Sequence, residues 1–196
     1  QVATDVTAIK TALAMGQPIP ATHFDPNDPG SDVKVARLRM DIYEPMNDTI
    51  TDRPVIVYVH TGNFLPPPLN GGPTGRKEDS TAVYLCREWA KRGFVAVALS
   101  YRLGWNPLAS GPTGPIVRRA TLLNAVYRAI HDVKECVRSL KEDESNSNTY
   151  GIDPDKIVLY GQGSGGYVAL AYATLDKQSE TEIQKFVYPG TTDSSY

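Results

Sequence analysis

The feature that most constrains the fold is a short apolar run that leads into a cluster of glycines at residues 161–166. Residues 157–160 have the composition of a buried strand, and residues 167–173 have the apolar, alanine-rich composition of a helix. Four of the six residues between them are glycine. So many residues without side chains are expected where a strand turns sharply into a helix that lies close to it. The sequence therefore predicts a strand, a tight turn and a helix.

Strand, tight turn and helix form the setting of the G-x-S-x-G pattern, the nucleophile elbow of serine hydrolases. Laid on Gly161 and Gly165, the pattern places the nucleophile at Gly163, which has no hydroxyl group. An elbow nucleophile has a strained backbone, and the residues two before and two after it must be small. If Ser164 is the nucleophile instead, Gly166 fits but the bulky Gln162 falls two residues before it. The backbone requirement favours Gly163 at the apex, and the chemistry favours Ser164.

A second interpretation of the same glycines is a dinucleotide site. Gly161, Gly163 and Gly166 satisfy G-x-G-x-x-G, a pattern that wants an acidic residue about 20 residues further on. The candidates for this acidic position are Glu180, Glu182 and Asp193. A dinucleotide fold places this turn in its first βα unit and then needs several more units, whereas only a short stretch follows here. We therefore favour the hydrolase interpretation.

The rest of the chain predicts an α/β fold with a mostly parallel sheet and helices on both faces. Residues 33–43 alternate apolar and polar positions, and residues 54–60 and 94–101 are continuous apolar runs typical of buried strands. A helix is predicted from a Ser80 cap to Gly93, and a longer amphipathic helix over 118–141. Strands that alternate with helices in this way form parallel sheets.

Two regions of different character are expected, an irregular N-terminal arm over 1–32 and a domain over 33–196. The net charge of −2 gives no general attraction to nucleic acid, and no apolar run reaches the ~20 residues of a membrane helix. Cys86 and Cys136 fall in predicted helices, which favours buried thiols over a disulfide. No cluster has metal-ligand spacing, so neither a metal nor a cofactor is expected.

The chain opens with Gln1 rather than methionine, which is expected of a processed or trimmed chain. We expect that a secretory signal has been removed, and hence a secreted, periplasmic or extracellular location.

Several motifs follow one another in a fixed order along the chain. They are residues 40–45 (MDIYEP), 60–64 (HTGNF), 100–104 (SYRLG), 150–157 (YGIDPDKI) and the glycine turn at 161–166. This order resembles the N-terminal part of the carboxylesterase/lipase branch of the α/β-hydrolases, over about residues 38–173. The resemblance implies ester hydrolysis by acyl transfer to water, with a small-molecule ester or similar ligand as the partner.

The resemblance also implies where the oxyanion hole lies. In this family the strand that ends in histidine carries an HGGG-type loop whose backbone N–H groups bind the oxyanion. Gly62 fits that loop, whereas Thr61 and Asn63 depart from it. The expected oxyanion donors are Gly62, Asn63 and the Ser164 N–H, and the expected pocket residues are Thr61, Phe64, Gln162 and Trp105.

The catalytic apparatus is incomplete in this sequence. Family order is serine, then an acid, then histidine, yet His23, His60 and His131 all precede the turn. One hypothesis is a carboxylesterase-like hydrolase with Ser164 as nucleophile, whose acid and histidine come from a missing C-terminal portion or from a second chain that completes the sheet. The alternative is a non-catalytic binding or interaction protein of the same fold, with Gly163 at the nucleophile position.

Overall fold

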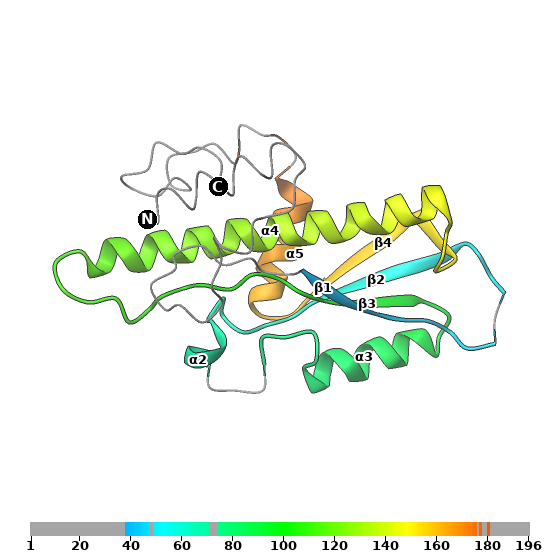
Figure 1. Ribbon diagram of the computed structural model, residues 1–196, viewed down its shortest axis with the longest axis horizontal. Helices are drawn as coiled ribbons and strands as arrows, with labels where there is room; N and C mark the ends of the chain where they lie inside the picture. The colour runs from blue at the N-terminus through cyan, green and yellow to red at the C-terminus, as the bar shows by residue number, and fades with distance from the viewer. Residues whose placement is uncertain (1–37, 48, 71–73, 176, 178–179, 181–196) are drawn as a thin grey trace, which may run out of the picture. The chain divides into compact units, whose positions relative to one another are not determined.

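The computed structural model describes residues 38–47, 49–70, 74–175, 177 and 180. The predicted arm over 1–32 and residues 33–37 of the first predicted strand lie outside these residues. The elements, drawn in Figure 1, are β1 (Arg39–Tyr43), β2 (Arg53–Val59), α2 (Pro67–Asn70), α3 (Ser80–Ala90), β3 (Val95–Ser100), α4 (Gly114–Asn146), β4 (Ile152–Gly161) and α5 (Ser164–Thr174).

The four strands form one sheet in the order β1-β3-β2-β4. Strand β2 pairs in parallel with β3 on one side and β4 on the other, while β1 runs antiparallel to β3. The predicted mostly parallel α/β sheet is confirmed. The two inner strands are apolar on both faces because helices cover both faces, which is why their sequences do not alternate.

Helix α3 lies on one face of the sheet, and α4 and α5 lie on the other (Figure 1). Side chains of a strand point alternately to the two faces, so each inner strand contributes to two cores. Val55, Val57 and Val59 belong to the core on the side of α4 and α5. Tyr58 lies on the opposite face, where it packs in the core that contains Cys86 of α3. Both cysteines are buried and free, as predicted.

Some element boundaries differ from the prediction. Helix α4 begins at Gly114 and ends at Asn146, beyond the expected 118–141. Proline stands in its first turn, where the missing N–H costs nothing. Residues 153–155 lie inside β4, where the pairing is irregular and the register shifts between Arg53 and Val55 of the neighbouring strand. The Asp155 N–H donates to the Asp153 side chain at 2.9 Å and so keeps a local turn within the strand.

The predicted cap of α3 is also different. Asp79, not Ser80, precedes the first helical residue. Its carboxylate does not cap the helix, but accepts hydrogen bonds from the Gly75 N–H at 2.8 Å and the Arg76 N–H at 3.2 Å. The loop before α3 is therefore held by the residue at which that helix starts.

Candidate functional site

The turn between β4 and α5 has its strained residue at Gly163. The backbone angles there are φ 55° and ψ −123°, a combination that residues with a Cβ rarely adopt. Such conformations cost other residues about 1–3 kcal/mol and cluster at functional sites. The residue at the apex of the turn is therefore Gly163, which has no side chain.

Close contacts explain the glycines on each side of the apex. A Cβ at Gly161 would lie 2.2 Å from the Gly165 carbonyl oxygen, and a Cβ at Gly165 would lie 2.0 Å from the Val59 carbonyl oxygen. Both contacts are with backbone, which cannot move aside as a flexible side chain can. A Cβ at Gly166 would come no closer than 3.4 Å to its nearest neighbour. The two positions that require glycine thus flank Gly163 symmetrically, two residues away on each side.

Ser164 is the first residue of α5, and its side chain is buried. The Asn63 N–H donates to Ser164 Oγ at 3.1 Å. Ser164 Oγ also lies 3.3 Å from the Tyr101 hydroxyl, which donates its proton to the His60 carbonyl oxygen at 2.8 Å. Because Tyr101 has a single hydroxyl proton, the Ser164 hydroxyl is the donor between them. Ser164 as nucleophile stays a prediction.

The loop after β2 has three successive residues with positive φ, namely Gly62 at 125°, Asn63 at 53° and Phe64 at 58°. The Phe64 carbonyl oxygen accepts from the N–H groups of Gly104 and Trp105, each at 2.9 Å. Together with the bond from Asn63 to Ser164, these contacts fix the loop beside the turn. The same contacts show that the Asn63 N–H, an expected oxyanion donor, already has an acceptor inside the protein.

His60 lies beneath this loop and is fully buried. Its Nδ1 lies 2.6 Å from the Thr61 carbonyl oxygen and donates to it, and its ring stacks on Tyr101 with centroids 4.0 Å apart. Burial lowers the pKa of His60 below its usual 6.5. Nε2 has no hydrogen-bond partner within the described part of the chain, so a proton there would be a buried, unpartnered donor. These contacts make His60 a neutral packing residue.

Thr61 occupies the space above the apex of the turn. A Cβ built on Gly163 would lie 2.3 Å from Thr61 Oγ1 and 3.2 Å from Thr61 Cβ. The Thr61 side chain thus lies where the side chain of an elbow nucleophile would begin. Gly163 itself is exposed and Thr61 is half-buried, so this point is open to solvent.

The other three predicted pocket residues do not all lie on the same side of the sheet. Phe64 is buried against Tyr101, with ring centroids 6.1 Å apart, and Trp105 packs against the core on the side of α4. Gln162 accepts a hydrogen bond from the Tyr58 hydroxyl at 3.0 Å, on the α3 face of the sheet. Thr61, Gly62, Asn63, Gly163 and Ser164 are therefore brought together, whereas Gln162 is drawn away from them.

Tyr101 is the site residue that the sequence did not single out. It follows β3 directly, where the ends of parallel strands bring ligand sites together. An aromatic side chain with a polar tip at that position was the available signal. Burial raises the pKa of Tyr101 to about 12, so its hydroxyl stays protonated at neutral pH.

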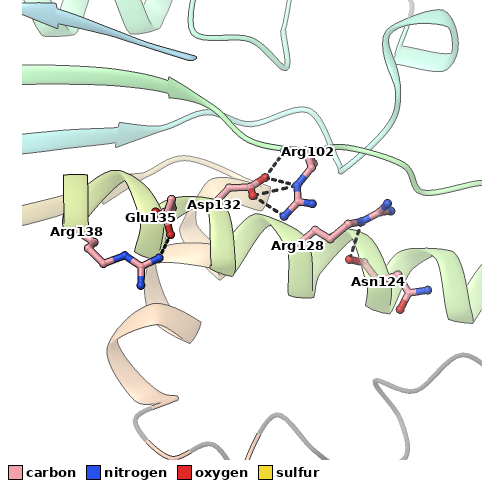
Figure 2. Close-up of polar contacts among 6 residues, drawn as sticks. All are labelled: Arg102, Asn124, Arg128, Asp132, Glu135 and Arg138. Atoms are coloured by element: carbon pink, nitrogen blue, oxygen red, sulfur yellow. Dashed lines mark hydrogen bonds and ion pairs between the residues drawn. The ribbon is translucent and has the colours of Figure 1, made fainter. Parts of the chain in front are cut away.

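An ion pair ties the chain after Tyr101 to α4 (Figure 2). The Asp132 carboxylate, whose side chain is 1% exposed, accepts from the Arg102 N–H at 2.8 Å and from Arg102 Nη2 at 2.7 Å. Asp132 therefore pairs with a residue that follows β3 and not with one on its own helix. Glu135 and Arg138 do pair with each other on the exposed face of α4.

The sheet, the glycine turn and the helices on both faces give the arrangement that the resemblance to the α/β-hydrolases predicts. Residues 118–195 match the family model BD-FAE, an esterase family of that class. This match covers less than half of the chain and shows a resemblance of its C-terminal part to that esterase family. Within the described residues no helix is long and apolar enough to cross a membrane.

Solved structures similar to this chain include three forms of esterase 2 from Thermogutta terrifontis. The native form is 26% identical with a TM-score of 0.49, and the match covers 69% of this chain and 39% of that one. The propionate-bound form is 27% identical with a TM-score of 0.49, covering 74% and 46%. The form phosphorylated by paraoxon is 26% identical with a TM-score of 0.49, covering 71% and 43%. This chain spans less than half the length of these structures.

Proposed function

We propose that this chain is a binding protein with the esterase-type α/β-hydrolase fold, which holds a small carboxylate or ester at the turn without forming a covalent acyl intermediate. The observation that carries the proposal is Gly163 at the strained apex, with Thr61 Oγ1 2.3 Å from the position of a Cβ. Covalent catalysis needs a nucleophilic side chain, and the apex has none.

The surroundings of Ser164 support the same proposal. A serine nucleophile needs an adjacent general base. The hydrogen-bond partners of Ser164 Oγ among the described residues are the Asn63 N–H and the Tyr101 hydroxyl, and neither is a base at neutral pH. His60 uses Nδ1 on the Thr61 carbonyl, and His131 lies exposed on α4.

The ligand class follows from the groups that remain at the turn. Helix α5 starts there, so its N-terminal end favours a negatively charged or strongly polarised oxygen. The structures of the Thermogutta esterase include butyrate-bound and propionate-bound forms. Butyrate is therefore the first ligand to test on this chain.

Ester hydrolysis through Ser164 is the second candidate function. It is favoured by the position of the Ser164 hydroxyl, which lies 3.1 Å from the backbone nitrogen of an expected oxyanion donor. In that case the acid and the histidine come from outside the described residues, and acyl transfer to water requires both.

A labelling experiment separates the two candidates. The purified chain and its Ser164→Ala variant are treated with a fluorophosphonate probe and assayed with p-nitrophenyl butyrate, while butyrate binding is measured by titration. We expect butyrate binding, no labelling and no turnover above the buffer rate. Labelling and turnover that disappear in Ser164→Ala would establish the hydrolase and reject the binding proposal.

A further inference from the structure

Two departures from the family pattern meet at one point in space. Thr61 stands where the HGGG-type loop has a glycine, and Gly163 stands where the elbow has a serine. The two positions come from the ends of β2 and β4, which are adjacent parallel strands in register at Val59 and Gly161. Their side-chain positions coincide, since Thr61 Oγ1 lies 2.3 Å from a Cβ built on Gly163.

We infer that Thr61 supplies the hydroxyl that faces the ligand at the turn, in the place left by the missing serine side chain. This inference rests on the proposed binding function and names the residue that contacts the ligand. Compared with the family pattern, the turn has lost a hydroxyl at Gly163 and the loop opposite it has gained one at Thr61. We call this pair of differences the Thr61/Gly163 exchange.

The hydroxyl is available for this role. Thr61 uses its carbonyl oxygen to accept from His60 Nδ1, which fixes its backbone. Its side-chain hydroxyl has no hydrogen-bond partner among the residues that the structure describes. The side chain is half-buried next to the exposed Gly163, so a ligand oxygen reaches it from solvent.

The hydroxyl acts as a hydrogen-bond donor, not as a nucleophile. No described base contacts Thr61 Oγ1, so nothing is placed to take its proton. A carboxylate oxygen of the ligand needs only a donor, which the hydroxyl provides without any bond being broken.

The steric part of the inference predicts coupling between the two positions. Threonine is branched at Cβ and has few rotamers, so it does not turn away easily from a serine at 163. Gly163→Ser alone therefore creates a clash, and Thr61→Gly removes it. In urea unfolding, Gly163→Ser lowers the midpoint, and adding Thr61→Gly to that variant raises it again. Strictly additive midpoint shifts would overturn the exchange.

The ligand part is tested by butyrate titration followed by NMR. Thr61→Val keeps the shape and removes the hydroxyl, and we expect it to weaken the butyrate Kd at least fivefold. Thr61→Ser restores a hydroxyl and keeps the Kd within about twofold. Thr174→Val is the matched control, because Thr174 is exposed on α5 and donates to the Leu170 carbonyl. Urea midpoints establish that each variant is folded.

The outcomes separate this inference from the proposed function. Wild-type butyrate binding that Thr61→Val leaves unchanged overturns the role of Thr61 while the binding function stands. A wild-type chain that shows no butyrate-induced shifts overturns both.

Discussion

Gly165 and Gly166 are neighbours in α5, yet the turn constrains them very differently. We predict that Gly165→Ala destabilises the fold by about 3 kcal/mol, because its Cβ would lie 2.0 Å from the Val59 carbonyl oxygen. Gly166→Ala is expected to be neutral or to stabilise by up to about 1 kcal/mol, because it replaces a helical glycine with room for a methyl group. Urea unfolding followed by circular dichroism compares the two. The reverse ranking would place the apex of the turn at Ser164.

His60 makes the stability of the fold depend on pH. Burial lowers the pKa of His60 below its usual 6.5, so near that pH the unfolded state binds more protons than the folded state. The neutral His60 ring makes its full contribution to the free energy of unfolding above pH 6.5. This contribution is lost as the pH falls toward the pKa of His60 in the folded state. We expect a loss of up to about 1.4 kcal/mol per pH unit between pH 6.5 and 5.5.

The measurement is urea unfolding at pH 7.5, 6.5 and 5.5 for the wild type and His60→Asn, whose amide can still donate to the Thr61 carbonyl. The variant should have a flatter dependence on pH. Desolvation and the nearby charges of Lys134 and Arg102 also lower the pKa of His131, but that residue is present in both proteins and cancels in the comparison. Equal slopes would show that His60 is not held neutral.

The sequence predicted the backbone of the glycine turn better than the contacts around it. The requirement for small residues at 161 and 165 predicted Gly163 at the apex, and the structure has the positive φ there. The contact between Thr61 and Gly163 was not predictable locally, because it depends on β2 and β4 being neighbours in the sheet. Tyr101 was missed for the same reason, since its partners His60 and Ser164 come from two other elements.

At the scale of elements, a buried ion pair holds the start of the segment after β3 against α4. Arg102→Met leaves the Asp132 carboxylate buried without its guanidinium, and we expect a loss of about 3 kcal/mol. Asp132→Asn should cost less, about 1–2 kcal/mol, because the Arg102 side chain is 40% exposed and water solvates it. Glu135→Gln is the matched control on the same helix, with an expected change below about 0.5 kcal/mol (Figure 2).

Thermal and urea unfolding of the three variants test this order. A control as damaging as Arg102→Met would mean that the effect is one of general charge on α4 rather than of the buried pair.

The type of each element was easier to predict than its ends. Continuous apolar runs identified β2 and β3, because both are inner strands covered on both faces. The expected helix over 118–141 is shorter than α4 at both ends, and at its start the first turn of the helix tolerates a proline. Strand β4 contains Asp153 and Pro154, and its pairing with β2 is irregular there, with a register shift between Arg53 and Val55.

At the scale of the whole molecule, β4 forms one edge of the described sheet. Val158 and Tyr160 on this strand are 56% and 42% exposed. An apolar edge strand with unpaired backbone groups is a template for pairing with another chain. A mostly parallel sheet is rarely left open in this way, because its strands are buried on both faces.

We predict that the purified chain self-associates through the β4 edge as its concentration rises. Val158→Lys places a charge on that edge and should shift the population toward the monomer in size-exclusion chromatography with light scattering. Met46→Lys is the control, because Met46 is 86% exposed and follows β1 at the opposite edge of the sheet. It adds the same charge without touching β4, so the association should persist. A wild-type chain that stays monomeric throughout would mean that the β4 edge is covered in solution, and a Met46→Lys variant as monomeric as Val158→Lys would mean that net charge, not the edge, controls association.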